Sequence, residues 1–289
     1  MFLSTRTLVR WLGFRGMRRL GALFGALQYR FGGADQRRCL RDLAQLQGLP
    51  PGDPLVERQL REAYRVNTVA VLEVMAMFDR KLDAATLASQ CRIDGLERLE
   101  VARHGQGVLL LATHSGNALL FAAQLASAGW PVTVVYRRAR MMSDDFFVQG
   151  LAKYGIDGVL ANEGLKAYAK MLDAVRHGRI VFATMDQGVK LAKDGVPVRF
   201  LGKDMPMPGG VAQLARATRA PVFPVATMAA DPVWHFAVEP QVSLKPYGTL
   251  EKDLEALLRP AERQVLERPQ LWSWHHRRWR KFPLAGRST

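Results

Sequence analysis

The sequence has few cysteines and no long uncharged run in its apolar N-terminal stretch. Its two cysteines, Cys39 and Cys91, are too few and too far apart for a disulfide framework or a cysteine-based zinc site. This favours a reducing compartment that faces the cytoplasm. The longest uncharged run after Arg19 covers residues 20–29, well short of the roughly 20 residues that a spanning helix needs. Because arginines interrupt the apolar part and no small-residue cleavage site follows, a signal peptide is not expected.

Acidic residues are scarce at both ends of the chain, and the net charge of +15 is concentrated there. Residues 1–38 contain eight Arg and one acid, which gives +7. Residues 259–289 contain seven Arg and one Lys against two Glu, which gives +6, so only +2 remains for the residues between them. Two basic ends on a nearly neutral body predict a surface that meets polyanions. Nucleic acid and anionic lipid both fit this charge pattern.

The N-terminal stretch combines helical apolar spacing with aromatic side chains and arginines. Leu20, Leu23, Phe24 and Leu27 recur at three- and four-residue steps, which is typical of a helix that lies in a lipid interface. We therefore interpret residues 1–34 as a basic amphipathic membrane-associating segment. The alternative is an ordinary helix that packs on the domain and leaves its basic face in solvent.

The remaining residues, 35–289, are predicted to form one α/β domain, with a mainly helical part at 35–100 and a core at 107–283. Helical spacing predicts helices over 35–46 and 54–82, and Gly48 ends the first of them. Further along, short apolar runs typical of strands in a parallel sheet occur at 108–112, 132–136, 180–184, 196–201, 222–227 and 233–238. Helical patterns fall between or after these runs at 116–128, 143–154, 164–177, 209–219 and 250–268. This alternation predicts a layered sheet with flanking helices and a helical N-terminal extension.

A histidine follows the first predicted strand. His114 comes two residues after the run 108–112 and just before a predicted helix. Ligand sites of open α/β sheets form at the carboxyl ends of strands, so His114 is placed to act as a general base. Capping or packing is the alternative role for a histidine at this position.

Several blocks of sequence resemble one family in the same order. They are His114–Asn117, Val135–Arg138, Met185–Gln187, Pro208–Ala215 with Ala220–Pro224, and the Trp-rich run Pro269–Trp279. Together they resemble the lysophospholipid acyltransferase superfamily, in the branch of the lipid A biosynthesis lauroyl and myristoyl acyltransferases. The resemblance implies a fold like that of the glycerolphosphate acyltransferases.

The resemblance also implies an activity and a place of action. His114 would take the proton from a hydroxyl or amine of a lipid-like or amphipathic acceptor as this group attacks an acyl thioester. Acyl-carrier protein or CoA would carry the thioester as co-substrate, and no cofactor is implied. The expected location is peripheral, on an anionic lipid surface at the cytoplasmic face of the bacterial inner membrane.

The sequence departs from the family at the acid of its catalytic motif. The family has Asp or Glu five positions after the histidine, whereas Leu119 stands there in this chain. A leucine can neither accept a hydrogen bond nor hold charge. Three alternatives follow: Asp186 at a neighbouring strand end supplies the acid, Asn117 orients the ring as a neutral acceptor, or the protein binds or delivers acyl chains without transferring them.

Other residues in these blocks suit substrate binding. A guanidinium forms bidentate bonds to phosphate oxygens, so Arg137 and Arg138 are candidates for a phosphate group, or else they lie at a solvated strand end. Gln187 belongs to the block that resembles the family's Asp-Gln pair. Gly209 and Gly210 precede a predicted helix and could bring backbone N–H groups to an anion, or simply start the helix.

Metal and nucleic-acid functions are not expected. His275 and His276 lack the spaced Cys or acidic partners of a metal site and are interpreted as structural. The sequence contains no recognised nucleic-acid-binding motif, although aromatic residues interleaved with arginines near the C-terminus are compatible with binding single strands.

Overall fold

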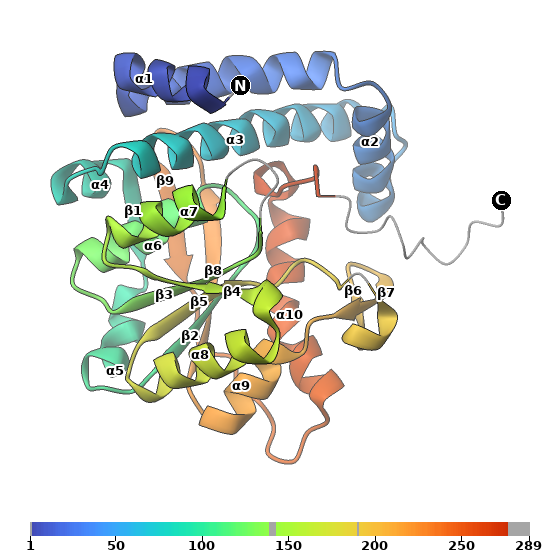
Figure 1. Ribbon diagram of the computed structural model, residues 1–289. Helices are drawn as coiled ribbons and strands as arrows, with labels where there is room; N and C mark the ends of the chain where they lie inside the picture. The colour runs from blue at the N-terminus through green and yellow to red at the C-terminus, as the bar shows by residue number, and fades with distance from the viewer. Residues whose placement is uncertain (1, 139–142, 190, 277–289) are drawn as a thin grey trace.

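A seven-stranded sheet forms the centre of the computed structural model, which describes residues 2–138, 143–189 and 191–276 (Figure 1). The strands of this sheet are β1 (Cys91–Asp94), β2 (Val108–Ala112), β3 (Val132–Tyr136), β4 (Asp157–Leu160), β5 (Ile180–Thr184), β8 (Val222–Ala229) and β9 (Trp234–Val238). Their order is β1-β9-β8-β2-β5-β3-β4, and neighbours are parallel except for β8 and β9. Because β2 and β5 are parallel neighbours, with Ala112 paired to Thr184, the segments that follow them leave the same edge of the sheet.

Helices cover both faces and one end of this sheet (Figure 1). The α-helices are α1 (Phe2–Arg30), α2 (Gly33–Gln47), α3 (Pro54–Asp79), α4 (Ala84–Gln90), α5 (Glu100–Arg103), α6 (Ala118–Ser127), α7 (Asp144–Ala152), α8 (Leu165–Arg176), α9 (Gly210–Thr218) and α10 (Leu250–Glu267). Short 3-10 helices lie at Leu96–Leu99, Ala161–Glu163, Ala192–Asp194 and Pro269–Leu271. The expected α/β architecture with a helical N-terminal region is therefore confirmed.

The core lies on the two faces of the sheet. Side chains alternate along a strand, so Val108 and Leu110 pack with α6 residues on one face, whereas Leu109 and Leu111 pack with residues of α8, α9 and α10 on the other. All four are buried, which explains why the strand reads as a continuous apolar run in the sequence.

The N-terminal helices form a further layer across one end of the domain. In Figure 1, α1 (dark blue) lies along α3 (cyan), and α3 lies between α1 and the sheet. The sequence sets the start of α3, because Asp53 accepts a hydrogen bond from the N–H of Leu55 and Pro54 occupies the first turn. α2 ends at Gly48, which has the left-handed conformation expected of a helix terminator.

One predicted strand does not belong to the main sheet. Residues Val196–Phe200 form β6, which pairs in antiparallel fashion with β7 (Lys203–Met207) in a separate two-stranded sheet. Its side chains alternate between buried and more exposed positions, as expected of a hairpin with one face on the core. The polar and short strands β1 and β4 were not predicted, because residues such as Arg92 and Asp157 interrupt the apolar signal.

Candidate active site

The turn that carries His114 leaves the end of β2 and enters α6. Gly116 has a φ of 60°, and a Cβ there would lie 2.5 Å from the ring of Trp234, so this position requires glycine. The turn is also tied by side chains, since Thr113 Oγ1 lies 2.7 Å from Ser115 Oγ and Thr227 donates to the Ser115 carbonyl at 2.9 Å. The backbone that presents His114 is therefore fixed on both sides.

Asp186 is the acid that pairs with His114. Its Oδ1 lies 2.6 Å from His114 Nδ1, and its Oδ2 accepts from the His114 backbone N–H at 3.1 Å. Asp186 is completely buried, whereas 29% of the His114 side chain is exposed. A carboxylate on Nδ1 stabilises the tautomer in which Nε2 carries the lone pair and also stabilises the imidazolium. The structure thus brings His114 together with Asp186, the first candidate for a replacement acid, and the catalytic role of the pair stays a prediction.

The segment after α10 closes around this pair. Trp272 is fully buried and donates from Nε1 to Asp186 Oδ2 at 2.7 Å. The backbone N–H of Ser273 donates to the His114 carbonyl at 2.9 Å, and the N–H of Gly116 donates to the Leu271 carbonyl at 3.1 Å. Residues 269–276, the part of the Trp-rich run that the structure describes, therefore hold both members of the pair in place, and the rest of the run lies outside the described residues.

Polar side chains border the outward nitrogen of the imidazole. Thr184 Oγ1 lies 3.4 Å and the Gln187 side-chain nitrogen 3.3 Å from His114 Nε2. The His276 ring is exposed, and its centroid is 4.8 Å from that of His114. His275 instead packs edge-on against Tyr64 at 4.2 Å. The interpretation of both histidines as structural therefore suits His275, whereas His276 lies at the candidate site.

The two arginines after β3 have different surroundings. Arg138 forms an ion pair with Asp144 in the first turn of α7, with Nε 2.7 Å from Oδ2. Arg137 reaches toward the segment that holds Gln187, where its Nη1 lies 3.5 Å from the Gly188 carbonyl oxygen. Both side chains are exposed. Arg137 is thus the better placed of the two to meet a ligand at His114.

Asn117 does not orient the imidazole in this structure. Its Oδ1 accepts from the N–H of Leu120 at 3.0 Å and so caps α6, while its Nδ2 donates to Glu73 Oε2 at 3.1 Å. Leu119, at the position of the family's acid, packs against the core. Both ends of the Asn117 amide therefore have partners other than the imidazole of His114.

Gly209 and Gly210 lie at the start of α9, with Gly209 as its N-cap. A Cβ on Gly209 would meet Val196 at 2.8 Å and Leu250 at 3.4 Å, so close packing accounts for the glycine here. A role for this pair in binding an anion stays a prediction. Within the described ranges, no group of three or more His, Cys, Asp and Glu side chains is arranged to hold a metal ion.

Sequence reasoning missed Glu73, which is fully buried beside the turn that carries His114. It accepts from Asn117, from Trp234 Nε1 at 2.6 Å, and from Arg18 of α1 at 2.8 Å. A signal was present, because Glu73 is the sole charged residue between Val69 and Phe78 in an otherwise apolar part of α3. A charged residue in such a run is rarely buried without partners.

Most of the chain is similar in sequence to one family of known proteins. The profile of the family described as bacterial lipid A biosynthesis acyltransferase matches residues 2–281. A phosphatidylinositol mannoside acyltransferase of Mycobacterium tuberculosis is 26% identical over 263 residues, which cover 86% of this chain and 78% of the relative. The protein of the same name from Mycolicibacterium smegmatis is 28% identical over 235 residues, which cover 77% and 71% of the two chains.

Proposed function

This chain belongs to the bacterial lipid A biosynthesis acyltransferase family, and we propose that it transfers a fatty-acyl group from an acyl thioester to a lipid-like acceptor at a membrane surface. It is thus an acyltransferase, and the proposal concerns its donor, its surface and its catalytic residues. The observation that carries the proposal is the pair of His114 with the buried Asp186 at 2.6 Å. In this proposal Asp186 supplies the acid that position 119 lacks.

The proposed reaction uses the exposed edge of His114. Nε2 removes the proton from an acceptor hydroxyl as its oxygen attacks the thioester carbonyl. The C–S bond of the tetrahedral intermediate then breaks, and the imidazolium returns the proton to the leaving thiolate. Asp186 stays ionised and stabilises the imidazolium, and general base catalysis of this kind contributes about 10²- to 10⁴-fold to a rate. Acyl-carrier protein or CoA would carry the thioester.

The alternative is a homologue that binds or delivers acyl chains without transferring them. The bonding of the buried Asp186 bears on this alternative, because its carboxylate is held by three directed hydrogen bonds and one of them joins it to the imidazole. Asp186 accepts from Trp272 Nε1, from the His114 N–H and at His114 Nδ1. Because burying a charge is costly unless it is fully bonded, this arrangement favours catalysis.

We further propose that the acceptor carries a phosphate group near the reacting hydroxyl. Arg137 is exposed and directed toward the Gln187–Gly188 segment, where a guanidinium could bind phosphate oxygens of a lipid headgroup. The names of the mycobacterial relatives are consistent with this class, because they describe acylation of a phosphatidylinositol derivative.

The outer face of α1 is the proposed contact with the membrane. Among the described residues of this helix and the turn after it, several apolar and basic side chains are exposed: Trp11, Leu12, Arg15, Arg19, Leu23, Phe24, Leu27, Arg30 and Phe31. In the described part of the chain, no helix has the length and apolar content needed to cross a bilayer. The combination suits peripheral binding to anionic lipid, which we place at the cytoplasmic face of the bacterial inner membrane.

The proposal is tested with purified protein, an acyl-CoA or an acyl-carrier-protein thioester, and vesicles that contain phosphatidylinositol mannosides or lipid A precursors. Release of free thiol and mass spectrometry of the lipids report transfer. We expect transfer by the wild type and none above background by His114→Ala, while His177→Ala, at the exposed end of α8, serves as matched control. Equal transfer by wild type and His114→Ala would refute the assignment.

The membrane part has a separate test. Co-sedimentation with anionic vesicles is compared with binding to single-stranded oligonucleotide at the same salt concentration. We expect vesicle binding that weakens when Leu23 and Leu27 are both changed to Glu. Binding to the oligonucleotide alone would instead support a nucleic-acid partner for the basic ends.

A further inference from the structure

The inner face of α1 packs very closely on α3. A Cβ added to Gly21 would lie 2.7 Å from Val69 Cα, and one added to Gly25 would lie 2.6 Å from Arg65 Cα. Met17, one turn earlier, is fully buried. Because only glycine permits this approach, the position of α1 on α3 is narrowly defined.

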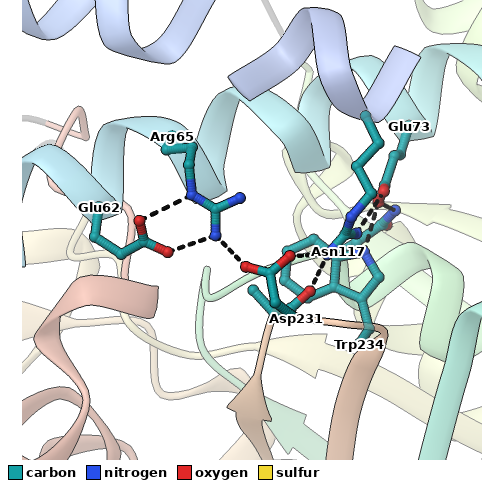
Figure 2. Close-up of polar contacts among 8 residues, drawn as sticks. Glu62, Arg65, Glu73, Asn117, Asp231 and Trp234 are labelled. Carbon is teal, nitrogen blue, oxygen red and sulfur yellow. Dashed lines mark hydrogen bonds and ion pairs between the residues drawn. The ribbon is translucent and has the colours of Figure 1, made fainter. Parts of the chain in front are cut away.

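From this inner face Arg18 extends into the domain. Its Nη1 lies 2.8 Å from Glu73 Oε1, and its Nη2 lies 2.8 Å from Asp231 Oδ1 and also contacts the Ala230 carbonyl. Figure 2 shows the other side of this cluster, where Asp231 contacts Arg65, which in turn binds Glu62 with Nε 2.8 Å from Oε2. α1, α3 and the β8–β9 turn are thereby joined by charged groups.

The second carboxylate oxygen of Glu73 contacts groups at the turn 114–117, which carries His114. Oε2 accepts from Asn117 Nδ2 at 3.1 Å and from Trp234 Nε1 at 2.6 Å (Figure 2). Asn117 caps α6 three residues after His114, and the Trp234 ring lies against Gly116. Both donors to Glu73 Oε2 thus contact the turn that carries His114.

Glu73 is fully buried, so the free energy of this site depends strongly on which groups pair with its carboxylate. Burial raises the pKa of this carboxyl, whereas Arg18, Asn117 and Trp234 act in the opposite direction. Removing one partner of a buried ion pair leaves an uncompensated charge, which is far more disruptive than replacing both partners together. A change at Arg18 therefore reaches Asn117 through a single side chain.

We propose that Arg18 and Glu73 are positioning residues through which the seating of α1 on a lipid surface adjusts the turn 114–117 and raises the rate of acyl transfer. The proposal rests on the proposed function. The lipid-facing groups Arg15, Arg19, Leu23 and Leu27 and the inward Arg18 are on the same helix, and α1 is fixed to α3 by glycine contacts. Because these contacts hold α1 and α3 together, a displacement of α1 on lipid carries Arg18 and Glu73 with it and so shifts the turn 114–117 between two arrangements, as coupling between two sites requires.

The experiment uses the full chain and vesicles of phosphatidylglycerol and phosphatidylethanolamine. The variants are Arg18→Met, the double variant Arg18→Met with Glu73→Gln, and Arg199→Met, which removes the same charge from an exposed position of β6. For each, kcat and KM are measured with and without saturating vesicles, together with the melting temperature and the hydrogen exchange of a peptide that covers residues 112–121.

For the wild type we expect vesicles to raise kcat by about tenfold and to slow exchange in the turn. Arg18→Met is expected to lower the melting temperature, because Glu73 is left buried without its cation. In the double variant a Gln oxygen can still accept from Asn117 and Trp234, so the melting temperature should return toward that of the wild type while the vesicle effect on kcat stays lost. Arg199→Met should keep the vesicle-induced rise in kcat.

A merely structural ion pair predicts a different pattern, in which the double variant regains both its melting temperature and its response to vesicles. That outcome would overturn the proposal, as would a wild type whose kcat and exchange do not respond to vesicles. If neither the wild type nor any variant transfers acyl groups, the proposed function fails. Hydrogen exchange of residues 112–121 then tests the coupling by itself. Slower exchange with vesicles in the wild type but not in the double variant would still support it, and no difference would overturn it.

Discussion

Asp186 Oδ1 lies 2.6 Å from His114 Nδ1, although the two residues are 72 positions apart in the chain. They meet because His114 follows β2 and Asp186 follows β5, and these two strands are parallel neighbours. The motif that the sequence resembles has an acid five positions after the histidine, where Leu119 stands in this chain. In the structure Leu119 lies in α6 and packs against the core, whereas the carboxylate on His114 comes from the segment after β5.

Asp186→Asn is expected to lower kcat by about 10²- to 10⁴-fold with little change in KM, because a neutral amide does not stabilise the imidazolium. The measurement is steady-state transfer with a soluble thioester donor. Asp173→Asn, at an exposed position of α8, is the matched control and should behave like the wild type. A twofold effect or less would mean that another group orients His114.

Leu119→Glu restores the residue type of the family motif, yet we expect no gain in activity. His114 Nδ1 already has its carboxylate, and Leu119 packs against the core. Leu119→Gln is the matched neutral variant, and thermal melting of both should show a loss of stability of about 1–3 kcal/mol. Higher kcat for the Glu variant alone would show that the site is impaired as it stands.

Trp272→Phe should lower both stability and kcat, because it removes the donor to Asp186 Oδ2. A hydrogen bond to a charged group contributes about 1.5–3 kcal/mol, and the orientation of the carboxylate depends on it. Trp274→Phe is the control, since Trp274 Nε1 donates to the Pro269 carbonyl and not to Asp186. This role is supported if both variants lose similar stability but only Trp272→Phe has a lower kcat. Equal kcat values for the two variants would contradict it.

Asp231 predicts a pH dependence of stability. Burial raises its pKa, but the hydrogen bonds and charges of Arg18 and Arg65 outweigh that effect, so the pKa lies below its ordinary value of 3.8. A carboxyl with a lowered folded-state pKa contributes stability that is present above the ordinary pKa and is lost as the pH falls through the lowered one. Asp231→Asn should thus be less stable than the wild type at neutral pH, and the difference should shrink in acid.

Urea unfolding of wild type and Asp231→Asn at a series of pH values measures this difference. Asp204→Asn, whose contact with Arg199 is long at 3.8 Å, is the comparison in which no such trend is expected. A difference between wild type and Asp231→Asn that stays constant down to the lowest pH would contradict the assignment of these pairs.

The sequence by itself determined most of the longer helices and the apolar strands, and it placed His114 just after a strand. Short apolar runs identified β2 and β5, and position alone placed His114 at a strand end. The apolar run at 196–200 did not indicate that this segment lies outside the main sheet, because such a run has the same appearance in a hairpin and in a parallel sheet. Charge at the two ends predicted a surface for anions, although most of the C-terminal basic cluster lies outside the described residues.

Only the tertiary structure decided which groups contact His114 and Asp186. Asp186, Trp272 and Gln187 come from segments far apart in the chain, and a hydrogen bond requires their atoms to agree within a few tenths of an ångström. Strand order and register fix such distances, and local sequence patterns predict neither of them. For the same reason Asn117 was open as an orienting group until the start of α6 and the buried Glu73 were seen to engage both ends of its amide.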